Sequence, residues 1–513
     1  MNVKTLSHKE RNFTQLKFLI PYIISGAIPA VLFTLIRLLL LASAGQRIFI
    51  FLPFITLPFL VFAGISYYFF ITHSCVFTIT NPFIIYTLSS AYSFCSYTIF
   101  QESGITSLLL FAFFPIVFFF FEQMITEKKF LPFSIACAIM LCIHPEAGLQ
   151  IALLLFVLAI LALLYYHKFK LGNLIHIVLL FLFSFGLANV RMVFYLVPFY
   201  AEHHDYSYNG FSLSYHPAVF VSRLLPWTTA SRTLVGTDNR MDLYFGLFPL
   251  ILFLFFFISF KISLRKKIYA GLFTMLIISM LEFSPVLYVF NLFHITYHST
   301  IKSSFFLVFW MLYIAAYALS RIHSICIGEI LLTVLSLLIL IVISWLWGYK
   351  NFHFPFLFIQ VALGLLYIIM LYHRQTKSHL VVYILLLTCL ELGSNCLFSA
   401  NTLFYKQGSS IEASFAFQNF TAKHSQKDTK KTTKNDKALD KQSDSKQKSN
   451  DSTTETAPQA NVSISYIVFD YIGVGISLLC VFWLLFLFTY DKKERIFNFM
   501  TQNKQRLNQI HIS

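Results

Sequence analysis

Long runs of apolar residues alternate along the chain with short polar connections. The runs Leu243 to Phe260, Ile327 to Trp347 and Tyr466 to Thr489 are each near the roughly 20 residues that a helix needs to cross hydrocarbon. Threading these and similar runs through a bilayer gives about fourteen crossings. The pattern therefore predicts an all-α, polytopic transmembrane helical protein.

The predicted helices share this length and apolar character. They lie near residues 18–42, 48–72, 82–100, 105–121, 173–199, 243–260, 268–283, 304–320, 324–348, 354–372, 379–397 and 466–489. Between basic flanks, Phe130 to Tyr166 is apolar except around His144, which predicts a helical hairpin. Its first arm, of about 14 residues, would rise only about 21 Å. We therefore expect His144 and Glu146, at the hairpin tip, to lie below the outer membrane surface.

The polar connections divide the chain into five parts. These are a basic cytoplasmic tail at 1–17, a transmembrane region at 18–397 with an outer loop at 200–242, an extracytoplasmic segment at 398–463, a final transmembrane helix at 464–489 and a basic cytoplasmic tail at 490–513. Within the extracytoplasmic segment, residues 421–463 are rich in Lys, Asp, Ser, Thr and Gln and contain no Phe, Trp or Tyr. Such a composition predicts a disordered linker.

Charge placement orients the predicted helices. The net charge is +16, and Lys and Arg cluster in alternate short connections and in both tails. This is the distribution that the positive-inside rule expects of cytoplasmic segments, so both termini are predicted to be cytoplasmic. Because orientation explains the basic charge, we expect a lipid bilayer as partner and no nucleic acid.

Composition agrees with this fold class. The chain has 513 residues, of which 58% are hydrophobic and 12% charged. We attribute the 61 Phe and 27 Tyr to lipid-facing bulk and an interfacial aromatic belt. The eight cysteines form no C-x-x-C pair and have no histidine at zinc spacing, so they predict apolar packing and no metal site.

Ionisable residues within the predicted helices are the candidates for chemistry, because a charge in the bilayer is costly. Under this threading the outer half contains Glu102, His144, Glu146, Arg191, Glu282, Lys302, Glu391 and Asp470. They predict a polar, outward-facing cavity in which a carboxylate acts as a base or holds a divalent cation, while Arg or Lys binds phosphate. Structural alternatives stay open: Glu102 as a helix-terminus residue, and His144 with Glu146 as a solvated turn.

Several function classes lack their motifs. The sequence contains no G-x-x-x-x-G-K-[ST], no G-x-S-x-G and no H-E-x-x-H. An ATP-driven pump, an α/β-hydrolase and a zincin therefore have no support.

Dispersed motifs across residues 60 to 320 resemble one group of proteins. The motifs are Ala91-Tyr92-Ser93-Phe94, Glu102-Ser103-Gly104, Phe114-Pro115-Ile116-Val117, Lys128-Lys129, His144, Phe194-Tyr195-Leu196-Val197-Pro198-Phe199, Tyr244-Phe245-Gly246-Leu247 and Ile301-Lys302-Ser303-Ser304-Phe305. They resemble bacterial membrane proteins of the YfhO type. They are also similar to the sister group called 6-pyruvoyl-tetrahydropterin synthase-related membrane proteins. Both groups are usually placed with the GT-C glycosyltransferases.

The resemblance implies a GT-C-like fold in the plasma membrane of a Gram-positive, low-GC bacterium. It also implies transfer of a sugar from a polyprenyl-phosphate donor to a cell-envelope glycan, on the extracytoplasmic side. Carried over by position, Glu102 is the base or metal ligand and His144 a positioning or proton-shuttling group. Lys302 and Arg191 then contact donor phosphate, with Glu146 also at the substrate.

One departure keeps other functions open. GT-C enzymes carry an essential aspartate in a long first outer loop, whereas here Ser43 to Arg47 alone joins the first two predicted helices. Either the chain lacks the usual N-terminal segment, or another acid serves, or the protein no longer catalyses. The alternatives are therefore a transporter or flippase of lipid-linked glycan and a non-catalytic scaffold of envelope biosynthesis.

Overall fold

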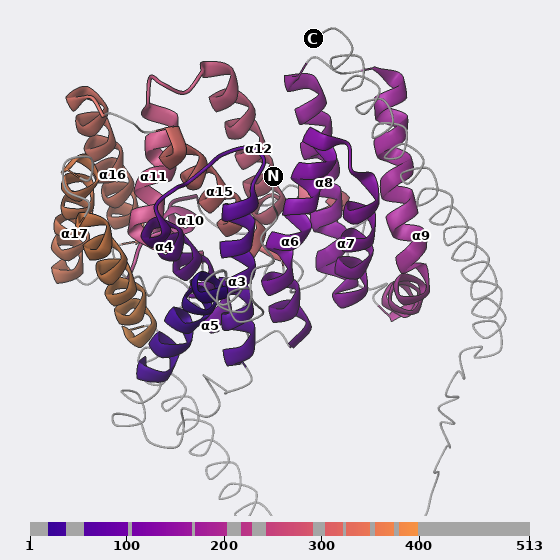
Figure 1. Ribbon diagram of the computed structural model, residues 1–513, viewed down its shortest axis with the longest axis horizontal. Helices are drawn as coiled ribbons and strands as arrows, with labels where there is room; N and C mark the ends of the chain where they lie inside the picture. Colours follow the sequence, from indigo (N-terminus) through magenta and orange to yellow (C-terminus); the bar gives the residue numbers. More distant parts are fainter. Residues whose placement is uncertain are drawn as a thin grey trace, which may run out of the picture.

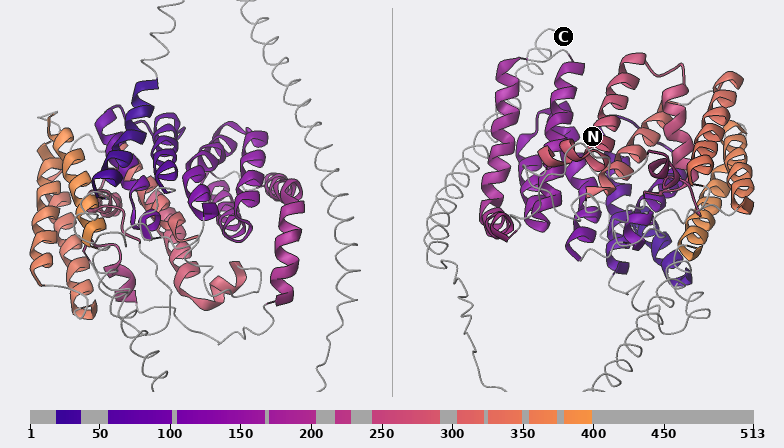
Figure 2. Two further views of the ribbon diagram at one scale, coloured as in Figure 1. Left: turned by 90° about the horizontal axis from the view of Figure 1, so that it is seen from below. Right: turned by 180° about the vertical axis from the view of Figure 1, so that it is seen from behind.

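The computed structural model describes the chain as a set of packed helices (Figures 1 and 2). The described residues are 19–36, 56–100, 105–166, 170–202, 217–227, 243–290, 303–321, 325–348, 354–373 and 379–398. The final predicted helix at 464–489, the linker and both tails lie outside them. The domain boundaries that depend on these segments therefore stay predictions.

The helices follow the predicted order. They are Leu19–Ile36, α3 (Thr56–His73), α4 (Pro82–Ser93), α5 (Ser96–Phe100), α6 (Ile105–Glu127), α7 (Phe130–Ile143), α8 (Pro145–Tyr165), α9 (Leu171–Glu202), α10 (Pro217–Ser222), α11 (Leu247–Ile258), α12 (Leu264–Glu282), α13 (Ser284–Phe290), α15 (Phe305–Arg321), α16 (Ile327–Gly348), α17 (Phe354–His373) and Leu380–Phe398.

Eight of the described helices are long and apolar enough to cross a membrane, and three further apolar helices are shorter. The shorter ones, α7, α11 and α15, correspond to predicted crossings. These helices confirm the all-α, polytopic membrane class. The predicted hairpin is also present: α7 has 14 residues and α8 begins at Pro145, directly after His144.

One predicted helix is wrong in detail. The sequence predicts a continuous helix over 82–100, but the chain leaves the helix after Ser93 and starts α5 at Ser96. Backbone groups at the break form hydrogen bonds outside the helix ladder. Ser96 N donates to Tyr244 O at 2.8 Å, and Thr98 Oγ1 donates to Ser93 O at 2.9 Å. Buried backbone groups need such partners, so these contacts make the break possible.

Contacts between chain-distant residues define one end of the bundle, here called the basic end. Arg265 Nη2 donates to Leu164 O at 3.3 Å, and Phe260 N donates to Glu329 Oε1 at 2.9 Å. These pairs bring the last turn of α8, the first turns of α12 and α16 and the last turn of α11 to one level. The described basic residues at this end are Lys128, Lys129, Lys170, Lys261, Arg265, Lys266, Lys267 and Arg321.

The opposite end, here called the tip end, contains the α7–α8 turn and the first turn of α11. Trp227 N donates to Asn395 Oδ1 at 2.8 Å, and Gln360 Nε2 donates to Pro226 O at 2.6 Å. Among the described lysines and arginines with a placed side chain, Arg223 alone belongs to this end. The uneven distribution fits the positive-inside rule, with the basic end cytoplasmic.

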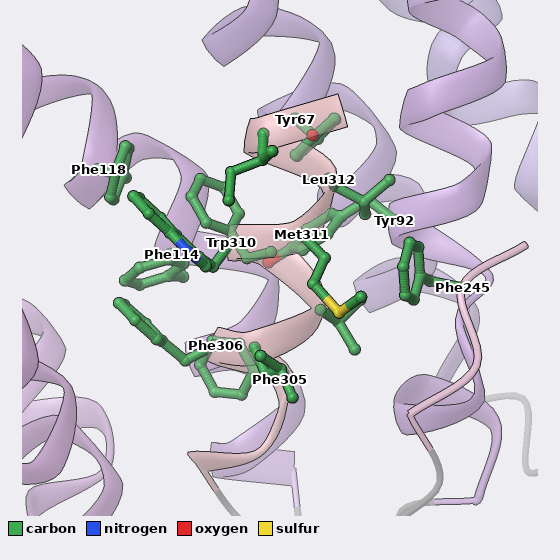
Figure 3. Close-up of a cluster of buried hydrophobic side chains, with 14 of the residues drawn as sticks. Tyr67, Tyr92, Phe114, Phe118, Phe245, Phe305, Phe306, Trp310, Met311 and Leu312 are labelled. Atoms are coloured by element: carbon green, nitrogen blue, oxygen red, sulfur yellow. The ribbon is translucent and has the colours of Figure 1, made fainter. Parts of the chain in front are cut away.

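An aromatic cluster fills the centre, where α3, α4, α6 and α15 meet (Figure 3). Tyr92 stacks on Tyr67 at 4.7 Å and on Phe111 at 4.3 Å between ring centroids, and its hydroxyl donates to Phe111 O at 2.6 Å. Phe114 packs edge-on against Phe309 at 4.7 Å. The attribution of phenylalanine to lipid-facing bulk is therefore wrong for this cluster. Aromatic contacts hold helices together where lipid provides no hydrophobic driving force.

Candidate functional site at the tip end

His144 and Glu146 lie at the turn between α7 and α8, and both are buried. His144 is the N-cap of α8, with an extended backbone at φ −144° and ψ 95°, and Pro145 follows at the first helical position. Glu146 occupies the first turn, where a carboxylate is stabilised by the helix dipole. The structural alternative of a solvated turn does not hold, because His144 and Glu146 are both buried.

The cap fixes the role of the two imidazole nitrogens. His144 Nδ1 accepts a hydrogen bond from Ala147 N at 3.3 Å. In the neutral ring, an accepting Nδ1 leaves the proton on Nε2. Nε2 is therefore the donor nitrogen of His144 in this tautomer, which suits positioning an oxygen better than abstracting a proton.

Close packing holds this turn in place. A Cβ added at Gly148 would lie 3.1 Å from both Leu141 Cα and Met140 O of the facing arm. Glycine at this position lets the two arms approach closely and keeps the cap geometry rigid.

The register of α7 against α9 brings Arg191 to the level of the tip. Phe133 packs on Phe181 with ring centroids 5.5 Å apart, and Cys137 contacts Ser184 one turn further along. Extending these parallel pairs places residue 144 beside residues 191–192. Figure 1 shows α7, α8 and α9 together on one side of the bundle. The backbone therefore supports grouping Arg191 with His144, although only the backbone of Arg191 is described.

The register of α12 against α15 concerns Glu282 and Ser303. Lys266 pairs with Tyr317 and Thr274 with Trp310, so α12 and α15 run antiparallel. Continuing this register places Glu282 level with Ser303, the first described residue before α15. Glu282 and Ser303 are both buried. Buried polar residues from α8, α12 and the start of α15 thus occupy the tip half of the bundle.

A third buried carboxylate, Glu391, has a structural role that the sequence did not reveal. Its Oε1 accepts hydrogen bonds from the Tyr244 hydroxyl and from Leu247 N, the latter at 2.7 Å, and its Oε2 accepts one from the Tyr367 hydroxyl at 2.6 Å. These bonds tie the segment before α11 to two neighbouring helices. We therefore assign Glu391 to the scaffold.

The basic end has two comparable carboxylates, which sequence reasoning missed. Glu122 Oε2 accepts from Ser74 Oγ at 2.8 Å and from Cys75 N at 3.1 Å. Glu329 accepts from Ser259 Oγ at 3.0 Å and from Phe260 N at 2.9 Å. Both fasten a connection to a helix. Apart from Cys326 N, which donates to Glu329 from three positions away, their partners are about 50 to 70 positions distant, so local patterns do not signal these roles.

The remaining predicted site residues lie outside the described part of the chain. Glu102 and Lys302 belong to this group, and their proposed roles stay predictions. Within the described residues, no group of three or more His, Cys, Asp or Glu side chains is arranged to hold a metal ion. The described geometry therefore assigns no ligands to a divalent cation.

Comparison with known families agrees with the fold and with the motifs. The family model described as bacterial membrane protein YfhO matches residues 30–454, which is most of the chain. The chain belongs to the YfhO family. It is accordingly a multi-pass protein of the bacterial plasma membrane. No curated protein and no solved structure matches it.

Proposed function

We propose that this YfhO-family protein is a membrane glycosyltransferase that moves a sugar from a polyprenyl-phosphate donor to a cell-envelope glycan on the extracytoplasmic side. The observation that supports this most is the buried polar tip, where His144 and Glu146 lie at the level of Arg191. Buried ionisable groups in a membrane protein are costly, and they commonly serve function.

The proposed roles follow from the chemistry of these groups. Arg191 and Lys302 bind the donor phosphate, since guanidinium and ammonium groups form charge-assisted hydrogen bonds to phosphate oxygens. His144 holds a substrate oxygen through Nε2–H, and Glu146 accepts a sugar hydroxyl. Glu102 serves as the general base that activates the acceptor hydroxyl.

A deletion strain tests the proposal. Loss of the gene removes one sugar from an envelope polymer, and plasmid-borne wild type restores it. A Glu102→Gln variant fails to restore it, because the amide cannot take the acceptor proton. The matched control is Glu127→Gln at the basic end, where Glu127 pairs with Lys129 at 2.6 Å in an exposed position. That control restores the sugar fully.

The same strain separates the alternatives. A flippase predicts that the lipid-linked donor accumulates on the cytoplasmic leaflet after deletion, whereas a transferase predicts that the donor reaches the outer leaflet and remains unused. A non-catalytic scaffold is favoured by the short connection Ser43 to Arg47, which has no carboxylate. It predicts full restoration by Glu102→Gln, and that result would remove Glu102 from the mechanism.

A further inference from the structure

A second feature lies at the basic end, away from the proposed site. A cleft of about 200 Å³ opens between α8, α12 and α15. Its inner wall is apolar and includes Leu158, Ala270 and Ile314. Its remaining wall is aromatic, with Tyr165, Tyr166, Tyr269, Trp310, Tyr313 and Tyr317. The cleft therefore combines an apolar inner wall with several tyrosine hydroxyl groups.

Lys266 is the cation that lines this cleft. Its Nζ donates to the Tyr317 hydroxyl at 2.5 Å and lies 5.1 Å from the centre of the same ring. None of the described residues that line the cleft is acidic. A hydroxyl partner carries no charge, so the positive charge of the Lys266 ammonium is not neutralised by it and can attract an anionic ligand.

Two arginines add positive charge beside the cleft. The Arg265 guanidinium lies 5.1 Å from the Tyr165 ring centre, and that of Arg321 lies 5.7 Å from the Tyr317 ring centre. Burial raises the pKa of the Tyr166 hydroxyl, so this group stays a protonated donor. Cations and hydroxyl donors therefore gather around one opening.

One carboxylate lies near this wall and bears on the sign of the ligand. Glu122 makes a side-chain hydrogen bond with the Tyr313 hydroxyl and does not itself line the cleft. Its Oε2 is already bonded to Ser74 Oγ and Cys75 N. The charge that faces the cleft is therefore positive.

We propose that this cleft binds one anionic phospholipid of the cytoplasmic leaflet, with its phosphate on Lys266 and the tyrosine hydroxyls and an acyl chain along the apolar wall. The basic end is cytoplasmic by its charge, and basic pockets between helices on that side suit anionic headgroups. The apolar wall selects a lipid over a soluble phosphate, because phosphate alone leaves that wall without contact.

The test measures lipid retained by the purified full-length protein. The protein is reconstituted with equal amounts of phosphatidylglycerol and phosphatidylcholine, and bound lipid is counted by native mass spectrometry. We expect one phosphatidylglycerol, preferred over phosphatidylcholine by about tenfold, since both lipids carry a phosphate but the choline ammonium cancels the headgroup charge and is repelled by Lys266 and the two arginines.

Three variants locate the site. Lys266→Gln lowers phosphatidylglycerol retention about tenfold. Lys267→Gln, its neighbour on the same helix, removes equal charge outside the cleft and leaves retention within about twofold. Ala270→Trp keeps all charges but fills the cavity, and it also abolishes retention. If Ala270→Trp does not fold, Ala162→Phe replaces it, because Ala162 also lines the cleft.

A soluble competitor separates headgroup from lipid. Glycerol phosphate at millimolar concentration leaves the bound lipid in place if the acyl chain contributes, as proposed. Complete displacement by glycerol phosphate would contradict the role of the apolar wall. Equal retention by wild type, Lys266→Gln and Ala270→Trp, or equal binding of both lipids, would overturn the site itself.

Discussion

The two ends of the helical bundle differ in how many of their charged side chains they expose, although the basic end also buries Glu122 and Glu329. At the tip end, His144, Glu146 and Glu282 are buried within the protein, whereas at the basic end Lys128, Lys129 and most other charged side chains are at least partly exposed. Exposed charges at a membrane surface cost little and set orientation. Burying a charged side chain costs several kcal/mol unless it is paired. The buried groups at the tip end therefore need hydrogen-bond partners within the protein, or they are retained because the protein's function requires them.

The largest expected effect comes from removing a scaffold carboxylate at the tip end. Glu391→Leu leaves the Tyr244 and Tyr367 hydroxyls and Leu247 N without their acceptor. We expect a loss of about 3–5 kcal/mol, as for breaking a buried polar cluster. Thermal unfolding in detergent measures it, and Glu391→Gln should lose clearly less, because an acceptor oxygen remains. Equal stability of Glu391→Leu and wild type would contradict the scaffold role.

The corresponding change at the basic end should cost less. Glu329→Leu removes the acceptor for Ser259 Oγ and for the N–H groups of Phe260 and Cys326. Phe260 is 76% exposed, whereas Glu329 and Ser259 are each 1% exposed, so solvent reaches only part of this contact. We expect about 1–2 kcal/mol in the same unfolding assay. A cost above that of Glu391→Leu would show that the two ends do not differ as described.

A hydrogen bond in the middle of the bundle provides an intermediate reference. Ser66 Oγ donates to Ala112 O at 2.6 Å and links α3 to α6. Such interhelical bonds in membrane proteins are worth about 0.6 kcal/mol on average. Ser66→Ala should therefore lower the unfolding temperature only slightly. A shift as large as that of Glu391→Leu would mean that packing at this contact had also been lost.

The smallest effect is expected at the exposed ion pair of the basic end. Glu127→Gln breaks the contact with Lys129, in which both side chains are more than 40% exposed. Surface pairs of this kind contribute about 0–1 kcal/mol, so we expect a change below about 0.5 kcal/mol. If the difference in unfolding free energy between this variant and wild type changed clearly with salt concentration, the ion pair would belong to a wider charge network than the one described.

Patterns in the sequence predicted the parts of this fold that depend on hydrophobicity and charge. The hairpin around His144, the order of the helices and the gathering of basic residues at one end all follow from local runs of residues. The break after Ser93 was missed because its support comes from Tyr244, about 150 positions away. The connecting roles of Glu122, Glu329 and Glu391 were missed for the same reason, since the partners that they tie together are mostly distant in the chain.

The candidate site was predictable only in part. Local sequence marked His144 and Glu146 as polar residues at a helical turn, but it also allowed a solvated turn. Their burial follows from the packing of α7 against α6 and α9, which no local pattern encodes. The tautomer of His144 likewise depends on the cap geometry at Ala147.

Sugar transfer by a His144→Asn variant tests the central claim most directly. Asparagine is a good N-cap and keeps an acceptor for Ala147 N, so the turn survives while the imidazole is lost. Purified protein in liposomes is supplied with a radiolabelled polyprenyl-phosphate sugar and an envelope glycan. We predict transfer by wild type and by Glu127→Gln, and a loss of about a hundredfold for His144→Asn. Undiminished transfer by a folded His144→Asn protein would contradict a catalytic site at the tip end.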